Sequence, residues 1–428
     1  MTPEDAVISG DAGISGDAVT PRAARHRVLV TGIGVESCAG GTPDELWDAL
    51  AAGRPAISPL ELEGPLPCQV GGVIRGFDPR EHMSAQQVRR TSRFQQLLFT
   101  AAMKARDDAR LRTAPGALYV GTGGGGLDET ARLVTVLNRS GWPRMDRLGL
   151  LRLLPNQAAG LVAQELGVTG PVLTLSTACA ASTDAIGAGL RAVRDGTADV
   201  VLVGGVESWL DIPALASFRL LDALSQRPAA QAALASRPFD RDRDGMVPAE
   251  GAAVLVLESE RSALRRGATV HGEVLGAAST CDAHHPVAPR ADGAMAARAI
   301  ELACADAGLE TAAVDLVSAH GTATPQGDRA ETAAIKRAFG AHARDVAITA
   351  PKSVIGHACG ASGILESVGV LRAIREKYVP PTANLRNPDP GCDLDYTPLV
   401  GRPAPIGVAV KQNFGFGGHN SAVVFGAA

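Results

Sequence analysis

Short runs of apolar residues recur along the chain and alternate with segments of helical periodicity. The runs lie at residues 27–34, 117–123, 171–178, 199–205, 252–258, 315–321, 346–352, 406–412 and 421–426. Helical patterns lie between several of them, as at 184–194 and 294–307, and these two are followed by Gly196 and Gly308. Such alternation predicts a layered α/β protein whose buried strands are largely parallel.

The start of the chain has a different pattern. Residues 1–25 use the sequence ISGDA twice and hold few bulky apolar side chains, so we predict a disordered tail. The apolar run at 27–34 is followed by TPDELWDALAAG, with Thr42 in the position of a helix N-cap. This order predicts a strand, a loop and a helix.

An internal echo suggests that the chain contains two similar halves. ACAAS at 178–182 is matched by ACGAS at 358–362, and the helices that follow end in LRAV and LRAI, with a spacing that differs by one residue. In an alanine-rich chain this match could be chance. The alternative, which we adopt, is a division into residues 26–267 and 268–428, each half with an equivalent strand-to-helix turn.

Composition and charge exclude several classes of function. Hydrophobic residues make up 46% and charged residues 20%, as in an ordinary globular protein, and a net charge of −4 gives no general attraction to nucleic acid or anionic lipid. The seven cysteines are spread along 428 residues, which favours reduced thiols over a secreted disulfide framework. Without a signal-peptide pattern or a long apolar run, we expect a cytoplasmic protein with no membrane segment.

Cys179, in LSTACAAST, follows an apolar run and precedes a helical pattern. At a helix N-terminus, backbone N–H groups and the helix dipole favour a thiolate, which is a strong nucleophile. A small cysteine that fills core space is the alternative, and position alone leaves both open.

His320 and His357 each follow an apolar run and lie among Gly, Ser and Thr. Imidazoles in such loops can donate to an oxyanion and move protons near pH 7. Lys352 and Glu366 flank His357, although each alone could be a surface charge. In the C-terminal KQNFGFGGHN, glycines would allow close approach to a ligand and a phenylalanine could act as a movable plug; a turn with core aromatics is the alternative.

Six segments together resemble the β-ketoacyl-acyl carrier protein synthases, in the elongating KAS I/II branch that includes type II polyketide ketosynthases. In chain order they are STACAAS, RPFDRDRDGMVPAEGAAVLVLE, HGTATPQGD, KSVIGHACGASGILE, NPDPGCDLD and NFGFGGHN. The resemblance runs from about residue 27 to the C-terminus. It implies a thiolase-like fold, with two related halves stacked as α-β-α-β-α layers, in a protein that is normally dimeric.

The resemblance also implies residue roles. Cys179 would be acylated from an acyl carrier protein, and His320 and His357 would support decarboxylation of a malonyl group and stabilise its enolate. The backbone N–H groups of Cys179 and Phe416 would hold the oxyanion, and Phe416 would gate the site. The remaining implied residues are the supporting pair Lys352 and Glu366 and the pantetheine-contacting Thr322 and Thr324.

Partners and cofactors follow from the same resemblance. Phosphopantetheine would arrive on the acyl carrier protein, with acyl and malonyl thioesters as substrates, and this chain would hold no permanent cofactor or metal. The dimer would be a homodimer or a heterodimer with a chain-length-factor-like subunit. The basic cluster at 86–93 is a candidate docking site for an acidic carrier protein through Arg89 and Arg90.

Two positions depart from the family pattern. Val287 stands where a Thr or Ser is common, which puts one pantetheine contact in doubt. Gly124 stands where many relatives have a bulky aliphatic residue that limits the acyl tunnel. We therefore hypothesise that the tunnel of this protein accepts longer or stiffer acyl chains.

Other protein classes and other kinds of site fit the sequence less well. A degradative thiolase needs a second cysteine near the C-terminus, and no cysteine follows Cys392. The initiating KAS III type uses a Cys-His-Asn set. A chain-length factor lacks the nucleophile. GTGGGG at 121–126 fits a nicotinamide motif only formally, since Asp146 does not end a strand. GxSxG is absent, and no paired zinc-ligand spacing occurs among Cys281, His284, His285, His357 and Cys359.

Overall fold

The computed structural model describes residues 26–62 and 64–428, so the predicted disordered tail lies outside the described residues. Ten strands form a mixed sheet in the order β10-β9-β13-β14-β8-β1-β7-β6-β4-β5. Their bounds are β1 Val28–Ser37, β4 Ala117–Gly121, β5 Val172–Leu175, β6 Val200–Glu207, β7 Gly251–Ser259, β8 Gly272–Cys281, β9 Leu316–Ser318, β10 Ala347–Thr349, β13 Val408–Gly415 and β14 His419–Gly426. Two short ribbons add β2 Ser58–Pro59 with β3 Val70–Gly71, and β11 Tyr378–Val379 with β12 Arg402–Pro403.

The strand order contains one five-strand pattern twice. When the strands of each half are numbered one to five along the chain, β1 to β7 and β8 to β14 are both arranged 1-5-4-2-3. In both halves strand five pairs antiparallel with strands one and four, whereas strand two pairs parallel with strands four and three. A short pairing of Leu29 and Val30 with β8 joins the halves. The duplicated thiolase-like architecture is therefore present; the exact division at residue 267 stays a prediction.

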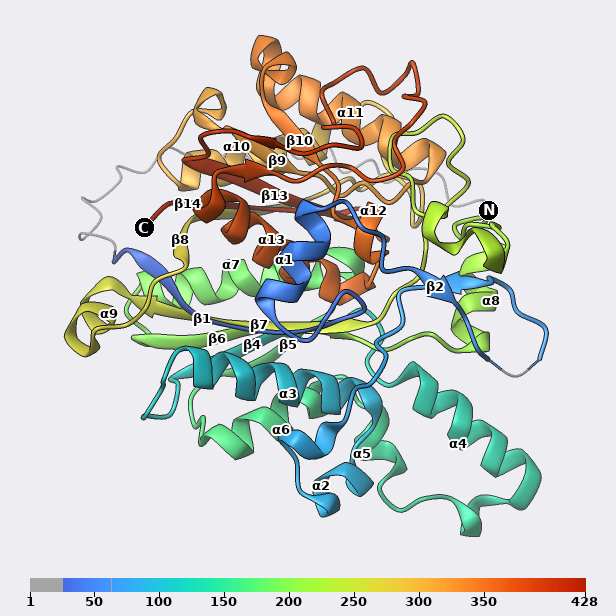
Figure 1. Cartoon of the computed structure of the whole chain (residues 1–428). Helices are drawn as coiled ribbons and strands as arrows, with labels where there is room; N and C mark the ends of the chain where they lie inside the picture. The colour runs from blue at the N-terminus through green and yellow to red at the C-terminus, as the bar shows by residue number, and fades with distance from the viewer. Residues whose placement is uncertain (1–25, 63) are drawn as a thin grey trace, which may run out of the picture.

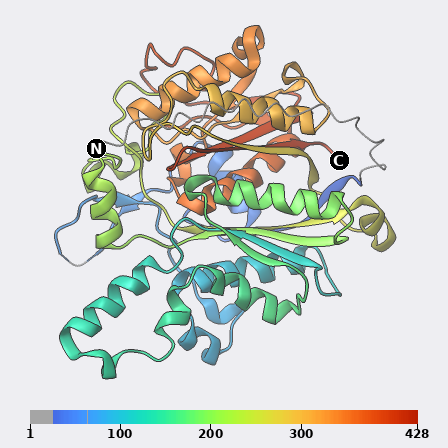
Figure 2. The same cartoon turned by 180° about the vertical axis from the view of Figure 1, so that it is seen from behind.

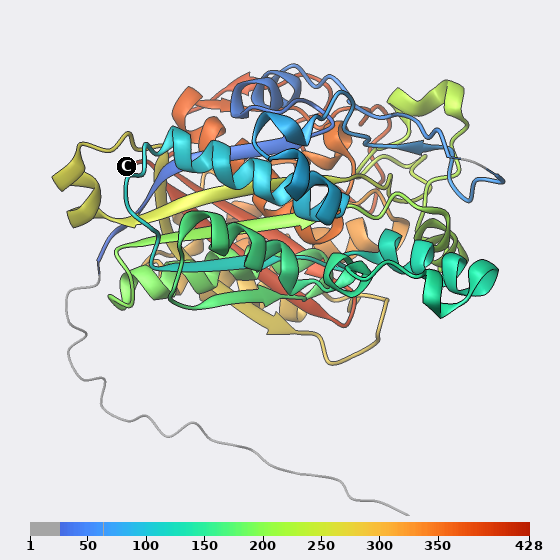
Figure 3. The same cartoon turned by 90° about the horizontal axis from the view of Figure 1, so that it is seen from below.

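Helices separate the two halves and cover their outer faces (Figures 1 and 2). α3 (Arg93–Asp108) packs on the first half together with α6 (Asn156–Leu166), as the view from below also shows (Figure 3). α7 (Ala181–Arg194) and α13 (Ser362–Glu376) contact strands of both halves, and α10 (Ala294–Asp306) covers the second half with α11 (Pro325–Phe339). These are the five predicted layers.

The other helices lie around this core. They are α1 (Pro43–Ala51), α2 (Ala85–Arg90), α4 (Leu127–Ser140), α5 (Gly149–Leu153), α8 (Ile212–Leu220), α9 (Glu260–Arg266) and α12 (Lys352–Ile355). α1 begins as predicted, because the side chain of Thr42 accepts a hydrogen bond from the N–H of Glu45. Within residues 26–62 and 64–428, no helix has the length and apolar character needed to cross a bilayer.

Two sequence predictions about the strands were wrong. The strands are not largely parallel, because each half has two antiparallel pairings. An apolar run indicates burial on both faces and carries no information about direction. The strand β8 was missed because GEVLGAASTC is built of small and polar residues and is only partly buried.

The turns before α7 and α13 are equivalent, and their positions correct the alignment of ACAAS with ACGAS that the sequence suggested. A short 3₁₀ turn precedes each helix, η3 (Ala178–Ala180) and η7 (Cys359–Ala361), and its first residue has a positive φ, +50° at Ala178 and +40° at Cys359. LRAV and LRAI each begin nine positions after the helix start. Cys179 is therefore equivalent to Gly360, and the match of ACAAS with ACGAS is one residue out of register.

Candidate functional site

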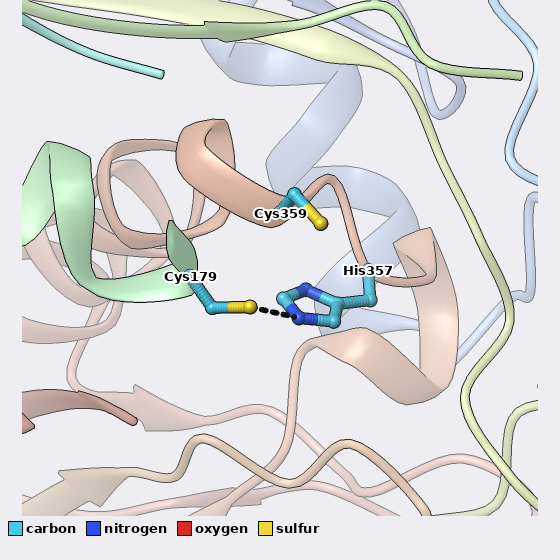
Figure 4. A group of neighbouring side chains, drawn as sticks. All are labelled: Cys179, His357 and Cys359. Carbon is cyan, nitrogen blue, oxygen red and sulfur yellow. Dashed lines mark hydrogen bonds between the residues drawn. The ribbon is translucent and has the colours of Figure 1, made fainter. Parts of the chain in front are cut away.

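Cys179 and His357 meet where η3 faces η7 (Figure 4). Nε2 of His357 lies 3.0 Å from Sγ of Cys179, and Nδ1 lies 2.8 Å from Oγ of Ser362, the first residue of α13. Both Cys179 and His357 are buried. Although Cys179 packs in an apolar cluster, its contact with an imidazole distinguishes it from a cysteine that only fills space.

His320 completes a three-residue group with them. Its ring lies 5.4 Å from that of His357, at 89° between the ring planes. Burial holds the pKa of His320 well below its ordinary value, and the neighbouring charges of Lys352, His357 and Lys411 lower it further. The ring is therefore neutral at physiological pH.

Asn413, which the sequence analysis missed, fixes the tautomer of His320. Nδ2 of Asn413 lies 3.2 Å from Nδ1 of His320, and Oδ1 of Asn413 accepts from the hydroxyl of Thr183 at 2.8 Å, so the amide nitrogen faces the ring. Nζ of Lys352, which can only donate, lies 3.5 Å from the same Nδ1. Nδ1 is therefore an acceptor, and the proton is on Nε2.

Lys352 and Glu366 form a buried ion pair beneath this group. Nζ of Lys352 lies 2.6 Å from Glu366 and donates to the carbonyl of His320 at 2.7 Å. Their side chains are 1% and 0% exposed, which excludes the surface-charge alternative. Lys411, missed in the sequence, pairs with the other oxygen of Glu366 at 2.7 Å. A lysine inside the apolar strand VAVKQN was the available signal.

The charges of this buried group depend on one another. Burial lowers the pKa of Lys411 to about 8, against the opposing effect of Glu366. Burial raises the pKa of Glu366, but Lys352 and Lys411 outweigh that effect and hold it below its ordinary value. One carboxylate therefore compensates two cations.

Two carboxylates of α11 hold the loop that carries His320. Glu331 accepts from the N–H groups of His320 at 2.5 Å and Gly321 at 2.7 Å, and Asp328 accepts from Ala323 at 3.1 Å. Asp328 also pairs with Arg243 at 3.1 Å. These acids, missed in the sequence analysis, fix the loop because its N–H groups have no strand partner.

Cys359 lies beside Cys179 and was not expected there. The pKa of Cys179 is well below its ordinary value; a hydrogen bond with Cys359 contributes most, burial opposes it, and His357 and Lys352 lower it further. The same hydrogen bond, with burial, raises the pKa of Cys359 well above its ordinary value. The charge of the pair therefore belongs on Cys179.

A cavity of about 370 Å³ opens onto Cys179, His320 and His357. Its wall includes the predicted pantetheine residues Thr322 and Thr324, whose hydroxyl oxygens are 3.2 Å apart. The wall also includes Val287 and Phe416. The cavity is thus deep enough to reach the sulfur and is lined mainly by apolar side chains.

The loop with Phe416 passes against the turn of Cys179. The ring of Phe416 stacks on Phe218 with centroids 5.9 Å apart, and the next two residues, Gly417 and Gly418, have φ of +85° and +80°. A Cβ on Gly415 would lie 2.6 Å from the carbonyl of Thr177 and 3.2 Å from the nitrogen of Cys179. Glycine is therefore required at 415, and the two predicted oxyanion donors, Cys179 and Phe416, are neighbours across it.

The backbone N–H groups of the glycine-rich segment 121–126 donate hydrogen bonds to a carboxylate of the protein itself. Glu207, at the end of β6, accepts from the N–H groups of Gly123 at 2.7 Å, Gly124 at 3.2 Å and Gly360 at 3.0 Å. Burial raises the pKa of Glu207 to about 7. These donors are therefore occupied, which argues against a nucleotide phosphate there. Gly124 does not line the 370 Å³ cavity.

The candidate docking arginines lie away from this cavity. Arg89 and Arg90 are exposed on α2, and neither lines the cavity. Arg93 of the same cluster is committed to Glu250, 2.6 Å away, and Lys104 pairs with Glu36. Only part of the cluster is thus free to meet a partner.

Comparison with known proteins identifies the family. The model for "Beta-ketoacyl synthase, N-terminal domain" matches residues 25–263, and that for "Beta-ketoacyl synthase, C-terminal domain" matches residues 271–386. The chain belongs to the beta-ketoacyl synthase family. It is therefore an acyltransferase, and the thiolase alternative is set aside.

Similar proteins agree over nearly the whole chain. The chain is 41% identical over 408 residues to 3-oxoacyl-[acyl-carrier-protein] synthase 2 of Synechocystis sp., covering 94% of this chain and 98% of that protein. The ishigamide ketosynthase/chain length factor structure has a TM-score of 0.88 at 34% identity and covers 95% of this chain and 100% of that one. A type II PKS acyl-carrier protein in complex with its ketosynthase gives 0.86 at 33%, covering 94% and 100%.

Proposed function

We propose that this beta-ketoacyl synthase catalyses decarboxylative Claisen condensation of an acyl group on Cys179 with malonyl-acyl carrier protein. The observation that carries the proposal is the contact of Sγ of Cys179 with Nε2 of His357 at 3.0 Å, beside a neutral His320, at the end of an open cavity. Phosphopantetheine is supplied by the carrier protein, and the reaction takes place in the cytoplasm.

In the first step the thiolate of Cys179 attacks the carbonyl carbon of an acyl thioester. Backbone N–H groups of Cys179 and Phe416 hold the oxyanion, and a donor of this kind contributes about 3 kcal/mol. The bond from the carbonyl carbon to the pantetheine sulfur breaks and that sulfur takes a proton from solvent, so Nε2 of His357, which lies 3.0 Å from Sγ, keeps its own proton. The acyl group stays on Sγ.

In the second step a malonyl thioester enters the same cavity. The bond to its carboxylate breaks, CO₂ leaves, and the electron pair forms an enolate whose oxygen accepts from Nε2–H of His320 and of His357. The enolate carbon attacks the acyl carbon, and the bond to Sγ breaks. Cys179 is restored as the thiolate, and Thr322 and Thr324 contact the pantetheine arm.

Intact-protein mass spectrometry after incubation with acyl-acyl carrier proteins tests the proposal. The native chain should gain one acyl mass, Cys179→Ala none, and Cys281→Ala, a control at an exposed cysteine, the native amount. Label on the Cys179→Ala protein, or none on the native chain with any donor, would contradict the proposal.

Chain-length preference depends on Gly124 in our proposal. A Cβ at this position would lie 2.4 Å from the side chain of Leu127, so a larger residue would displace that side chain at the start of α4. A panel of acyl donors should show turnover of long or stiff chains by the native protein and a shift to short chains in Gly124→Leu. Turnover of short saturated chains alone would remove this hypothesis.

Carrier-protein docking through Arg89 and Arg90 is tested by charge reversal. Arg89→Glu with Arg90→Glu should raise KM for the acyl carrier protein and reduce its dependence on salt, because steering is electrostatic. Arg261→Glu with Arg265→Glu is the control on α9, where both arginines are exposed and pair with Asp199. An unchanged KM in the α2 variant would refute this docking site.

We propose that the dimer forms along β5. This edge strand is only partly buried and leaves Leu173 54% exposed, whereas β10, the edge of the second half, is buried. Apolar side chains of α4 and α5, including Leu137, Leu150 and Leu151, are also exposed. Light scattering should show a dimer that Leu173→Lys converts to monomer; a monomeric native chain would contradict homodimerisation.

A second candidate is a ketosynthase that is active only beside a chain-length-factor-like subunit. The similarity to the ishigamide ketosynthase/chain length factor favours it. Condensation assays of the chain alone distinguish the two. The heterodimer would be supported if the chain alone is acylated on Cys179 but does not condense, and if adding such a subunit restores condensation.

A further inference from the structure

Three potential metal ligands converge at the nucleophile. Cys179, His357 and Cys359 each direct one ligand atom into the same small space, and these atoms all lie within 4.8 Å of one another (Figure 4). All three residues are buried. The proposed condensation uses the first two and gives no reaction step to Cys359.

The fold, and no local sequence spacing, assembles this group. Cys179 belongs to η3, whereas Cys359 begins η7 and lies two positions after His357. The zinc ligands weighed from the sequence did not include Cys179, because its distance along the chain from His357 and Cys359 gives no ligand spacing. Of the residues considered there, His357 and Cys359 are in the group, and Cys281, His284 and His285 are not.

The size of the group suits a tetrahedral zinc ion. Bond lengths of about 2.3 Å to sulfur and about 2.0–2.1 Å to nitrogen place neighbouring ligand atoms roughly 3.5–3.8 Å apart. The distance of 3.0 Å between Sγ of Cys179 and Nε2 of His357 would need to open by about half an ångström. We expect small rotations of these two side chains to provide this movement.

The charges of the three ligands and the cavity beside them also suit a zinc ion. Two thiolates and a neutral imidazole balance a divalent cation, and the carboxylate of Glu207 lies close by, accepting from the N–H of Gly360 beside Cys359. The cavity reaches Cys179 and His357 but is not lined by Cys359, so a fourth ligand such as water would enter from the side of Cys179 and His357. This is the arrangement of an open three-ligand zinc site.

We propose that Cys179, His357 and Cys359 bind one zinc ion, which excludes acyl groups from Cys179. Cys359 is the residue that turns a nucleophile and its imidazole into a three-ligand site. Metal binding is independent of the proposed condensation; only the predicted inhibition rests on it.

Titration of the metal-free, reduced full-length chain tests binding directly. Cd²⁺ should produce a thiolate-to-metal charge-transfer band that saturates at one equivalent and is removed by competing Zn²⁺. Cys179→Ala and Cys359→Ala should each weaken Zn²⁺ binding by more than about 100-fold, since changes even outside the ligand set cost about 10–100-fold. Cys304→Ala, at a buried cysteine outside the group, should bind as the native chain does.

X-ray absorption of the zinc-loaded native chain keeps the test independent of variant folding. Two sulfur ligands and one imidazole are expected. Native-like affinity in Cys359→Ala, or a single sulfur ligand, would overturn the proposal. If condensation activity exists, Zn²⁺ should inhibit the native chain more strongly than Cys359→Ala, each relative to its own rate in chelator; failure of condensation itself would leave the binding result decisive.

Discussion

Nε2 of His357 lies 3.0 Å from Sγ of Cys179, although the two residues are 178 positions apart. The contact exists because two equivalent turns, each before a buried central helix, face one another across the repeat of the fold. His320 reaches the same space from a third segment, at the end of β9. The two imidazoles therefore have different access to the sulfur.

This difference predicts different defects in two histidine variants. His320→Ala should keep acyl transfer to Cys179 and lose about 10²–10⁴-fold in condensation, because it removes a donor to the enolate. His357→Ala should slow both steps, because it also removes the partner of the thiol. Single-turnover acylation by mass spectrometry and CO₂ release separate the steps. Equal loss of acylation in both variants would contradict this assignment.

Asn413→Asp should reverse the tautomer of His320. An ionised carboxylate accepts where the amide donated, so the proton would move to Nδ1 and Nε2 would lose its donor. We expect about 100-fold slower condensation with acylation retained. Nitrogen NMR of labelled histidine reports the tautomer directly. Asn138→Asp, at an exposed position of α4, is the control, and an unchanged tautomer in Asn413→Asp would refute the positioning role.

Glu366→Gln should destabilise the fold by about 3–5 kcal/mol, because it leaves the buried cations Lys352 and Lys411 uncompensated. Glu376→Gln is the matched control on the same helix, because the side chain of Glu376 is 40% exposed and its ion pair with Arg372, at the protein surface, is worth about 0–1 kcal/mol. Urea unfolding measures both. Similar midpoints for the two variants would show that the buried pair is not required.

Gly415→Ala should displace the turn η3, which carries Cys179. The added Cβ would lie 2.6 Å from the backbone oxygen of Thr177, so backbone must move, and we expect at least about 10-fold slower acylation of Cys179. Gly160→Ala, in α6, has open space around the new Cβ and should be neutral or stabilising by up to about 1 kcal/mol. Normal acylation by Gly415→Ala would contradict the required close approach.

Glu207 should make the fold less stable as pH rises. Burial raises its pKa from the ordinary 4.5 to about 7, so between these values the folded chain binds more protons than the unfolded chain and the free energy of unfolding falls with pH. Glu207→Gln should reduce this slope without abolishing it, because Asp328, whose pKa is also raised to about 7, contributes in the same direction. Urea unfolding at pH 5 to 8 measures the slope; an unchanged slope in the variant would refute this contribution.

Local pattern was sufficient for much of the architecture. Nine of the ten main strands could be predicted from apolar runs, because most of them are buried on both faces, although the edge strand β5 is only partly buried. The cap at Thr42 was visible because a helix start is a local event. The ordered motifs around Cys179, His320 and His357 indicated the family. β8 escaped because its small and polar residues carry no such pattern.

Tertiary structure decided which of these residues act together. The sequence determined a reactive-looking cysteine, two loop histidines and the alternation of strands and helices, since each depends on neighbours along the chain. It did not determine strand direction, the second lysine on Glu366, the amide that orients His320, or the thiol of Cys359 beside Cys179. Those relationships arise from packing between segments far apart in the chain, where the physical constraint is a shared buried space and sequence spacing holds no record of it.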